Sequence, residues 1–404
     1  MLAGTIFFLT YVGVALGRIP GLTIDRTGIA LLGAIGMIVS GVVPVETAVQ
    51  SIDVPTILLL YALMVISAQL RLGGFYTWTA LRMTTFLRKP RLFLLYSMLI
   101  SALLSAFLAN DIICLAFTPV IATVLLNVGL NPLPFLLGLA VSSNIGSAAT
   151  IIGNPQNMLI GQVGQLHFSD FLSWCGPPSL LALGAAYLLI AISYRGHFVT
   201  TPTAEQLEGK SQWPAFNAWQ SFKGLSAIIL LIFLFFTPIQ RELSAIGLAG
   251  ILLCSRKMKS RHMLELIDWH LITLFCALFI VNQGLAMANI PERLMTDLAG
   301  QGLNMHHPAM LTGLSALLSN IVSNVPAVML LIQFLDPGNP LEWYVLAVSS
   351  TFAGNLFVIG SIANLIVIEQ ARNFGIEIGF QKHLVVGVPV TLMSLAILIA
   401  WIYL

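Results

Sequence analysis

Long apolar runs, separated by short charged or Pro/Gly-rich breaks, recur along the whole chain and constrain its fold more than any other feature. About 20 apolar residues in a helix cross the hydrocarbon core of a bilayer, and a helix satisfies its own backbone hydrogen bonds there. Only 8% of the 404 residues are charged and 58% are apolar, unlike soluble proteins, in which roughly a quarter are charged. We therefore predict an all-α polytopic membrane protein in the lipid bilayer of the inner (plasma) membrane.

Composition and motifs also argue against several classes of function. The net charge of +2 gives no indication of nucleic-acid binding. Cys114, Cys175, Cys254 and Cys276 show no Cys-x-x-Cys spacing, and we interpret them as buried small hydrophobic residues. The sequence has no convincing nucleophile–base grouping and no metal motif such as H-E-x-x-H. We therefore expect no enzyme activity and no cofactor, with Na+ as the one candidate bound ion.

Ten segments are expected to cross the membrane, and polar residues interrupt two of them. The ten are 2–18, 28–45, 54–70, 132–160 (interrupted), 173–193, 224–240, 243–255, 269–288, 341–368 (interrupted) and 384–404. Two further apolar stretches, 92–127 and 308–335, carry polar residues at their middle. Each is about as long as two half-membrane helices, so we predict that each is a re-entrant hairpin that returns to the side it came from.

The distribution of Lys and Arg supports this arrangement, because cytoplasmic loops carry an excess of both. With the N-terminus outside and no net crossing by either hairpin, 16 of the 18 Lys and Arg residues fall on one side. Only Arg241 and Arg293 fall on the other. If either hairpin crossed fully, every later loop would change sides and the asymmetry would collapse. We therefore predict that both termini lie outside.

The chain also repeats itself. Residues 52–70 and 267–285 share Ile, Asp, Leu and Ala at the same positions, and each copy precedes a Leu-Leu-Ser tract with a central Asn and then a Gly/Asn-rich break. Each half holds five crossings and one hairpin. Because five is odd, the second half enters the membrane upside down, which is the inverted-repeat plan of many secondary transporters. The predicted repeats are 1–194 and 223–404, joined by a cytoplasmic linker at 195–222.

Polar tracts break an apolar run at equivalent places in the two halves, NIGSAATIIGNPQN at 144–157 and TFAGNLFVIGSIAN at 351–364. Unpaired backbone at membrane depth is tolerated only where protein or a water-filled cavity surrounds it. The freed amide and carbonyl groups of such broken helices bind anions and small cations. The alternative is a pair of kinks held by Ser, Thr and Asn hydrogen bonds within a bundle. Two corresponding tracts favour the broken helices.

The hairpin centres are the second pair of candidate sites, Asn110-Asp111 in the first and Ser323-Asn324 in the second. An Asn side chain offers an acceptor and two donors, so at a hairpin tip it can bind a desolvated cation and an anion's oxygens in turn. An ionisable group inside the membrane is costly and usually marks an ion or substrate path, so Asp111 is our candidate coupling group for Na+ or H+. The alternative is a tip that reaches headgroup water or pairs with a nearby Arg.

Four tracts of the chain resemble the ion transporter superfamily, which includes arsenite permeases, citrate transporters and divalent anion sodium symporters. FLANDIICLAFTP, SNIGSAATIIGNPQN, LLSNIVSNVPAVML and GNLFVIGSIANLIV stand in the superfamily's order, and the likeness covers nearly the whole chain. The resemblance implies a scaffold part and a moving transport part, usually within a homodimer, with elevator-type alternating access. The Asn-Asp tip looks more like the arsenite permease branch than the dicarboxylate branch.

Carried over residue by residue, the resemblance implies a substrate and ion site between the two tips and the two broken helices. The first half-site would consist of Asn110, Asp111, Asn144, Gly146, Thr150, Gly153 and Asn157. The second would consist of Ser323, Asn324, Gly354, Asn355, Gly360 and Asn364. Asn110, Asp111 and Asn324 would be the residues that hold Na+.

The sequence thus predicts a secondary carrier that moves a small anion, either an inorganic oxyanion or a carboxylate, driven by Na+ or H+. A Na+/H+ antiporter is an alternative, because Asp111 could bind cations alone, and an arsenite-type efflux permease is another. A channel is a further alternative, and it would need a continuous pore. The identity of the anion and the direction of transport stay open at this point.

Overall fold

The computed structural model describes residues 2–17, 21, 23–198, 215–291, 293 and 306–404, and the regular structure in these ranges is entirely helical. The prediction of an all-α fold is therefore confirmed. Six of the described helices are long and apolar enough to cross a membrane, and shorter apolar helices accompany them. The number of crossings stays a prediction, and most of the predicted linker at 195–222 lies outside the described residues.

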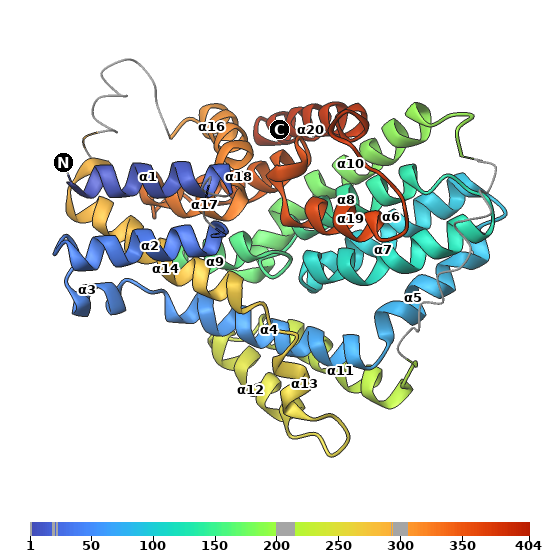
Figure 1. Ribbon diagram of the computed structural model, residues 1–404, viewed down its shortest axis with the longest axis horizontal. Helices are drawn as coiled ribbons and strands as arrows, with labels where there is room; N and C mark the ends of the chain where they lie inside the picture. The colour runs from blue at the N-terminus through green and yellow to red at the C-terminus, as the bar shows by residue number, and fades with distance from the viewer. Residues whose placement is uncertain (1, 18–20, 22, 199–214, 292, 294–305) are drawn as a thin grey trace.

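The helices form two bundles, which we call bundle A and bundle B (Figure 1). Bundle A contains α1 (Leu2–Leu16), α2 (Arg26–Val39), α4 (Val54–Leu72), α11 (Ala218–Leu234), α12 (Arg241–Leu253) and α14 (Trp269–Met287), with the short helices α3 (Val45–Gln50) and α13 (Ser260–Leu264). Helix α5 (Phe75–Met83) connects α4 to the second bundle. Both halves of the sequence contribute to bundle A.

Bundle B also draws on both halves. From the first half come α6 (Pro90–Phe107), α7 (Asn110–Asn127), α8 (Leu133–Ser147), α9 (Pro155–Val163) and α10 (Phe168–Ser193). From the second half come α16 (Pro308–Val322), α17 (Asn324–Leu331), α18 (Pro340–Ala353), α19 (Ile362–Arg372) and α20 (Phe380–Ile402). All the candidate site residues belong to this bundle.

Helices α4 and α14 begin in the same way, as their sequence similarity predicts. The Asp53 carboxylate accepts from the amide of Thr56 at 2.8 Å, and the Asp268 carboxylate accepts from the amide of Leu271 at 2.9 Å. A carboxylate at this position satisfies an amide that has no partner within the helix and interacts favourably with the helix dipole. Both residues are therefore N-caps.

Helices α6 and α7 form a helical hairpin. The hydroxyls of Ser101 and Ser142 lie 2.6 Å apart, and farther along Gly146 packs on the backbone of Ala102, so α6 runs parallel to α8. Helix α7 begins beside Asn144 and ends a short turn before α8 begins, so it runs antiparallel to both. The chain therefore reverses between α6 and α7, level with the end of α8. Each arm has 18 residues, longer than the half-membrane arms we expected.

The second half repeats this arrangement with shorter helices. Ser315 in α16 and Ser349 in α18 make the same hydroxyl contact as the serine pair of the first half. Ser323 alone separates α16 from α17 and has φ +75°. Such a conformation is strained for a residue with a Cβ atom and persists only where the surrounding structure imposes it. The second tip is therefore a tight, defined turn.

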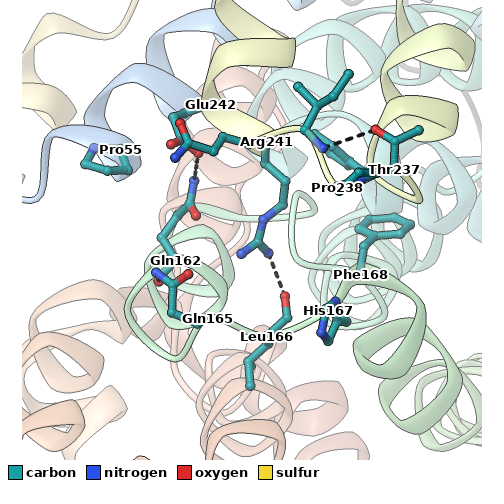
Figure 2. A pocket seen from close by; sticks show the side chains of 13 residues that line it. Pro55, Gln162, Gln165, Leu166, His167, Phe168, Thr237, Pro238, Arg241 and Glu242 are labelled. Atoms are coloured by element: carbon teal, nitrogen blue, oxygen red, sulfur yellow. Dashed lines mark hydrogen bonds between the residues drawn. The ribbon is translucent and has the colours of Figure 1, made fainter.

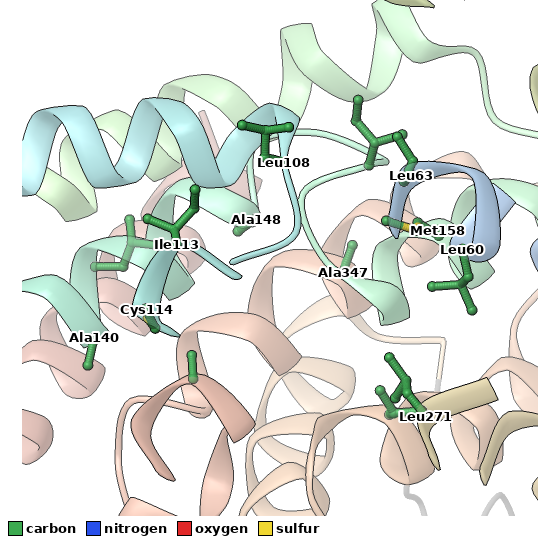
Figure 3. Close-up of a cluster of buried hydrophobic side chains, with 14 of the residues drawn as sticks. Leu60, Leu63, Leu108, Ile113, Cys114, Ala140, Ala148, Met158, Leu271 and Ala347 are labelled. Carbon is green, nitrogen blue, oxygen red and sulfur yellow. The ribbon is translucent and has the colours of Figure 1, made fainter. Parts of the chain in front are cut away.

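Buried apolar side chains hold the first tip between the bundles (Figure 3). The labelled residues are Leu60, Leu63, Leu108, Ile113, Cys114, Ala140, Ala148, Met158, Leu271 and Ala347. They come from α4 and α14 of bundle A as well as from the hairpin and broken helices of bundle B. Many large apolar side chains elsewhere point outward, such as Leu103 and Leu180, which are 62% and 67% exposed. This outer surface suits contact with lipid.

Candidate functional site

The first broken helix is closed by Asn157. Helix α8 ends at Ser147 and α9 starts at Pro155, with non-helical backbone between them. The side-chain Nδ2 of Asn157 donates to the carbonyls of Ser147 at 3.2 Å and Thr150 at 3.0 Å. The side chain is fully buried and satisfies carbonyls that the break has left without helical partners.

The second broken helix is closed in the same way by Asn364. Its side-chain Nδ2 donates to the carbonyls of Gly354 at 2.8 Å and Phe357 at 3.3 Å. In both halves the asparagine reaches back to the carbonyls ten and seven residues earlier. This identical spacing shows that the two breaks are the same structural device, present once in each half.

Asn144 joins the two halves. Its Nδ2 donates to Oδ1 of Asn355 at 2.9 Å and to Oδ1 of Asn364 at 3.3 Å. Its Oδ1 accepts from the Ser361 hydroxyl at 2.9 Å and from Nδ2 of Asn110 at 3.2 Å. Asn144 is 1% exposed. One buried amide thus links the first hairpin tip to the second broken helix, and we call these five residues the asparagine cluster.

Asn324, at the second tip, lies against its own half. In the orientation of the Asn324 side chain that satisfies both its amide oxygen and its amide nitrogen, Nδ2 donates to the carbonyls of Ser350 at 3.1 Å and Gly360 at 3.0 Å. At the first tip the backbone amide of Asn110 donates to the Gly153 carbonyl at 3.3 Å. Each tip is therefore tied to the break of its own half.

The candidate glycines and Thr150 hold elements in close contact. A Cβ atom on Gly146 would lie 2.3 Å from the Ala102 carbonyl oxygen, and one on Gly153 would lie 2.2 Å from the Ser147 carbonyl oxygen. In the second half, Cβ atoms on Gly354 and Gly360 would lie 2.7 and 2.8 Å from amide atoms of Asn324 and Asn320. The Thr150 hydroxyl donates to the carbonyl of Ala106. These positions shape the breaks and tips, since larger residues would force them apart.

Asp111 lies apart from the asparagine cluster. It lines a cavity of about 130 Å³ between the bundles, together with Arg71 at the end of α4 and Asp268 at the start of α14. Apolar side chains, including Leu63 and Ile112, form most of the wall. Of the three candidate Na+ residues, Asp111 therefore lines this cavity, Asn110 bonds to Asn144, and Asn324 bonds to carbonyls of its own half.

Several buried polar atoms near the tips have no hydrogen-bond partner among the described residues. They include Oδ1 of Asn110, Oδ1 of Asn320 and Nδ2 of Asn355. The two oxygens can accept from a ligand or bind a cation, and the nitrogen can donate to an oxygen of a ligand. Within the described ranges no group of three or more His, Cys, Asp or Glu side chains could hold a metal ion.

Sequence reasoning missed several members of this region. Neither Arg71 nor Asp268 was selected from the sequence as a site residue, although both line the Asp111 cavity. Asn320 and Ser361 stand within the quoted tracts and could have been named from their residue types. His383 in α20 is 1% exposed, and its Nε2 lies 3.0 Å from the Asn355 carbonyl. No pattern in the sequence indicated that contact.

A second cavity, of about 360 Å³, lies at the boundary between the bundles (Figure 2). The Arg241 guanidinium of α12 donates to the carbonyls of Leu166 at 2.9 Å and Gly161 at 2.8 Å, at the end of α9. Beside it, Gln162 donates to the Glu242 carboxylate at 3.2 Å. A cation at a helix C-terminus satisfies free carbonyls and interacts favourably with the helix dipole. These bonds connect bundle A to bundle B.

The fold is similar to that of two solved transporters. The MtrF protein of Neisseria gonorrhoeae, described as illuminating a class of antimetabolite efflux pumps, superposes with a TM-score of 0.62 at 14% identity, over 99% of this chain and 93% of that one. The YdaH transporter of Alcanivorax borkumensis gives a TM-score of 0.58 at 14% identity, over 100% and 96% of the two chains. At this identity the likeness concerns the fold.

Relatives in sequence cover almost the whole chain. A 46 kDa membrane protein of Mycobacterium leprae is 29% identical over 100% of this chain and 98% of its own length. A silicon efflux transporter of Oryza sativa is 28% identical over 94% and 92%, and an arsenical pump membrane protein of Escherichia coli is 27% identical over 98% of each. The family description "Citrate transporter" matches residues 11–344. The chain therefore belongs to the citrate transporter family, a group of integral membrane transporters within the superfamily that its tracts resemble.

Proposed function

We propose that this protein is a secondary active transporter of a small oxyanion or carboxylate, or of the corresponding uncharged acid, coupled to H+ or Na+. In this proposal bundle B carries the substrate and moves relative to bundle A. The observation that supports it most is the buried asparagine cluster, in which Asn144 of the first broken helix binds Asn110 of the first tip and three side chains of the second broken helix.

The cluster has the chemistry expected of a passage for a small polar solute. Its side chains are all neutral amides and a hydroxyl, so they can donate to or accept from a ligand without the strong binding that a fixed charge would impose. A transported solute must also leave, so moderate interactions serve transport better than tight ones. The unpartnered Oδ1 of Asn110 and Nδ2 of Asn355 are available to such a ligand.

Asp111 is the proposed coupling group. A carboxylate near an anion in a medium of low dielectric constant costs several kcal/mol unless a cation or proton intervenes. Because Asp111 is next to Asn110 in the tip and faces the cavity between the bundles, an ion bound there would alter both the tip and the contact with bundle A. Movement of the substrate and movement of the ion would then depend on each other.

The contacts between the bundles are compatible with an elevator-type movement. Besides Arg241, Tyr11 of α1 and Asn282 of α14 form a polar contact with α17, in which Asn282 donates to the Met329 carbonyl at 3.1 Å and the Tyr11 hydroxyl lies 3.3 Å from the Pro326 carbonyl. The Asp111 cavity lies at the predicted cytoplasmic ends of α4 and α14. In the proposal this structure is therefore an inward-facing state.

The relatives guide the choice of substrates to test. One of them is named an arsenical pump membrane protein and another a silicon efflux transporter, and the family is named for citrate. Arsenite, silicic acid and citrate are accordingly the first three probes, and export is as open as uptake. We further propose a homodimer in the inner membrane with both termini outside.

The test of coupling is transport by Asp111→Asn in proteoliposomes. The wild-type protein should accumulate one of the three probes when a Na+ or pH gradient is imposed. Asp111→Asn should lose at least tenfold of the gradient-driven rate, because the amide cannot exchange a proton and binds Na+ more weakly. Asp53→Asn is the matched control, since asparagine caps a helix as well as aspartate does. Unchanged dependence on Na+ and pH in Asp111→Asn would reject the coupling role.

A Na+/H+ antiporter is the second candidate, and one observation favours it. The Asp111 cavity holds two carboxylates against one guanidinium, a balance that favours cations over anions. In proteoliposomes, proton flux driven by Na+ alone, without any of the three probes, would support the antiporter. A requirement for a probe would exclude it.

A further inference from the structure

His383 is buried at the edge of the asparagine cluster, in the first turn of α20. It is 1% exposed, and its Nε2 lies 3.0 Å from the backbone carbonyl of Asn355. A carbonyl oxygen can only accept, so Nε2 carries the hydrogen. Both the neutral ring, in the tautomer with hydrogen on Nε2, and the protonated ring can make this bond. The contact holds the backbone at the start of the second break.

This bond is the first in a series within bundle B that joins the second half of the chain to the first. Asn355, held by His383 through its carbonyl, accepts at Oδ1 from Nδ2 of Asn144 at 2.9 Å. Asn144 in turn accepts at Oδ1 from Nδ2 of Asn110, at the first hairpin tip, at 3.2 Å. The position of the Asn355 backbone therefore determines where its side-chain amide meets Asn144 of the first half.

A glycine one turn later lets α20 approach the break closely. A Cβ atom on Gly387 would lie 2.5 Å from the Asn355 carbonyl oxygen and 2.8 Å from that of Leu356. Any larger residue would push α20 away and lengthen the bond from His383. Two positions on the same face of α20 thus support one short stretch of backbone.

The first half lacks this support, although its break is built in the same way. There an apolar groove of about 370 Å³ is lined by Ala149 and Thr150 of the break, by Gly176 and Ser179 of α10, and by α6. Helix α10 is the counterpart of α20 in chain order, and no hydrogen bond from it to that break is present among the described residues. The repeated architecture therefore does not itself require the His383 contact.

We propose that His383 is a positioning residue for the transport site, which sets the orientation of Asn355 through its backbone carbonyl. The inference rests on the proposed transport function for its kinetic consequence, but the positioning itself is a property of the fold. No charged side chain of the described residues makes a hydrogen bond or ion pair with His383. Lys382, its neighbour in the chain, donates instead to the Glu377 carbonyl.

The test compares His383→Gln with His383→Leu. Glutamine places an amide N–H at about the reach of Nε2, whereas leucine leaves the Asn355 carbonyl without a donor. With arsenite, silicic acid or citrate, whichever the wild type accumulates, His383→Leu should raise KM about tenfold while the maximal rate changes less. His383→Gln should stay within about threefold of wild type. His262→Leu, at an exposed histidine, is the control.

A second measurement is independent of transport. Hydrogen exchange of backbone amides in residues 354–361 should be faster in His383→Leu than in wild type, near wild type in His383→Gln, and unchanged in residues 148–154 for both. Equal exchange at 354–361 in all three proteins would overturn the proposal even if transport is observed. A glutamine variant as defective as the leucine variant would also overturn it, because the ring itself would then be needed. If none of the probes is carried, the proposed function fails while the exchange result still decides the role of His383.

Discussion

Asn157 and Asn364 each satisfy carbonyls that a broken helix exposes within the protein. Removing the amide leaves the carbonyl of Ser147 or of Gly354 without this donor, at a cost of about 1–3 kcal/mol, whereas the carbonyls of Thr150 and Phe357 keep the backbone amides of Gly153 and Gly360. Asn157→Ala and Asn364→Ala should therefore both lower the midpoint of thermal unfolding by several degrees in the same detergent. Asn373→Ala, at an exposed position after α19, should have no measurable effect. If only one of Asn157→Ala and Asn364→Ala were destabilised, the two breaks would not be equivalent.

At the residue scale, the sequence predicted which residues belong to the site better than it predicted which residues they contact. It selected Asn110, Asn144, Asn355 and Asn364, which the structure joins in one cluster. It grouped Asp111 with them, whereas the carboxylate faces bundle A, because neighbouring residues in the first turn of a helix point in different directions. His383 lies far along the chain from its partner, and only the packing of α20 on the break brings the two together.

At the scale of elements, Arg241 connects α12 of bundle A to the end of α9 in bundle B. A hydrogen bond to a charged group contributes about 1.5–3 kcal/mol, and partial exposure places Arg241 at the lower end of that range. Arg241→Ala should lower the thermal midpoint by a few degrees. Arg261→Ala should not, because Arg261 and its partner Glu265 are 87% and 57% exposed. A stability of Arg241→Ala equal to that of wild type would show that the contact does not hold the bundles together in solution.

The elements themselves follow largely from the sequence. Apolar runs, Asp caps and polar interruptions define α4, α14 and both broken helices closely, because these signals are local. The lengths of the hairpin arms were less predictable. The polar residues Asn110 and Asp111 suggested two half-membrane arms, but α6 and α7 have 18 residues each. The full length of α6 is tolerated because its serines bond to serines of α8.

At the scale of the whole molecule, the repeat predicted that the halves resemble each other, but not how they combine. The structure mixes them, because each bundle takes helices from both halves. This mixing places the two breaks side by side, so that Asn144 can bind Asn355 and Asn364. Contacts between distant residues of this kind depend on tertiary packing that no local pattern encodes.

The central claim is that the protein is a gradient-driven carrier, and accumulation in proteoliposomes tests it most directly. Purified wild-type protein would be given arsenite, silicic acid or citrate at equal concentration on both sides, with labelled probe on one side only, and a Na+ or pH gradient would then be imposed. We predict that one probe becomes concentrated on one side, severalfold above its starting level, and that the concentration difference collapses when an ionophore dissipates the gradient. Equilibration of every probe without accumulation would contradict a carrier and indicate a channel, and the absence of any movement would contradict transport of these solutes.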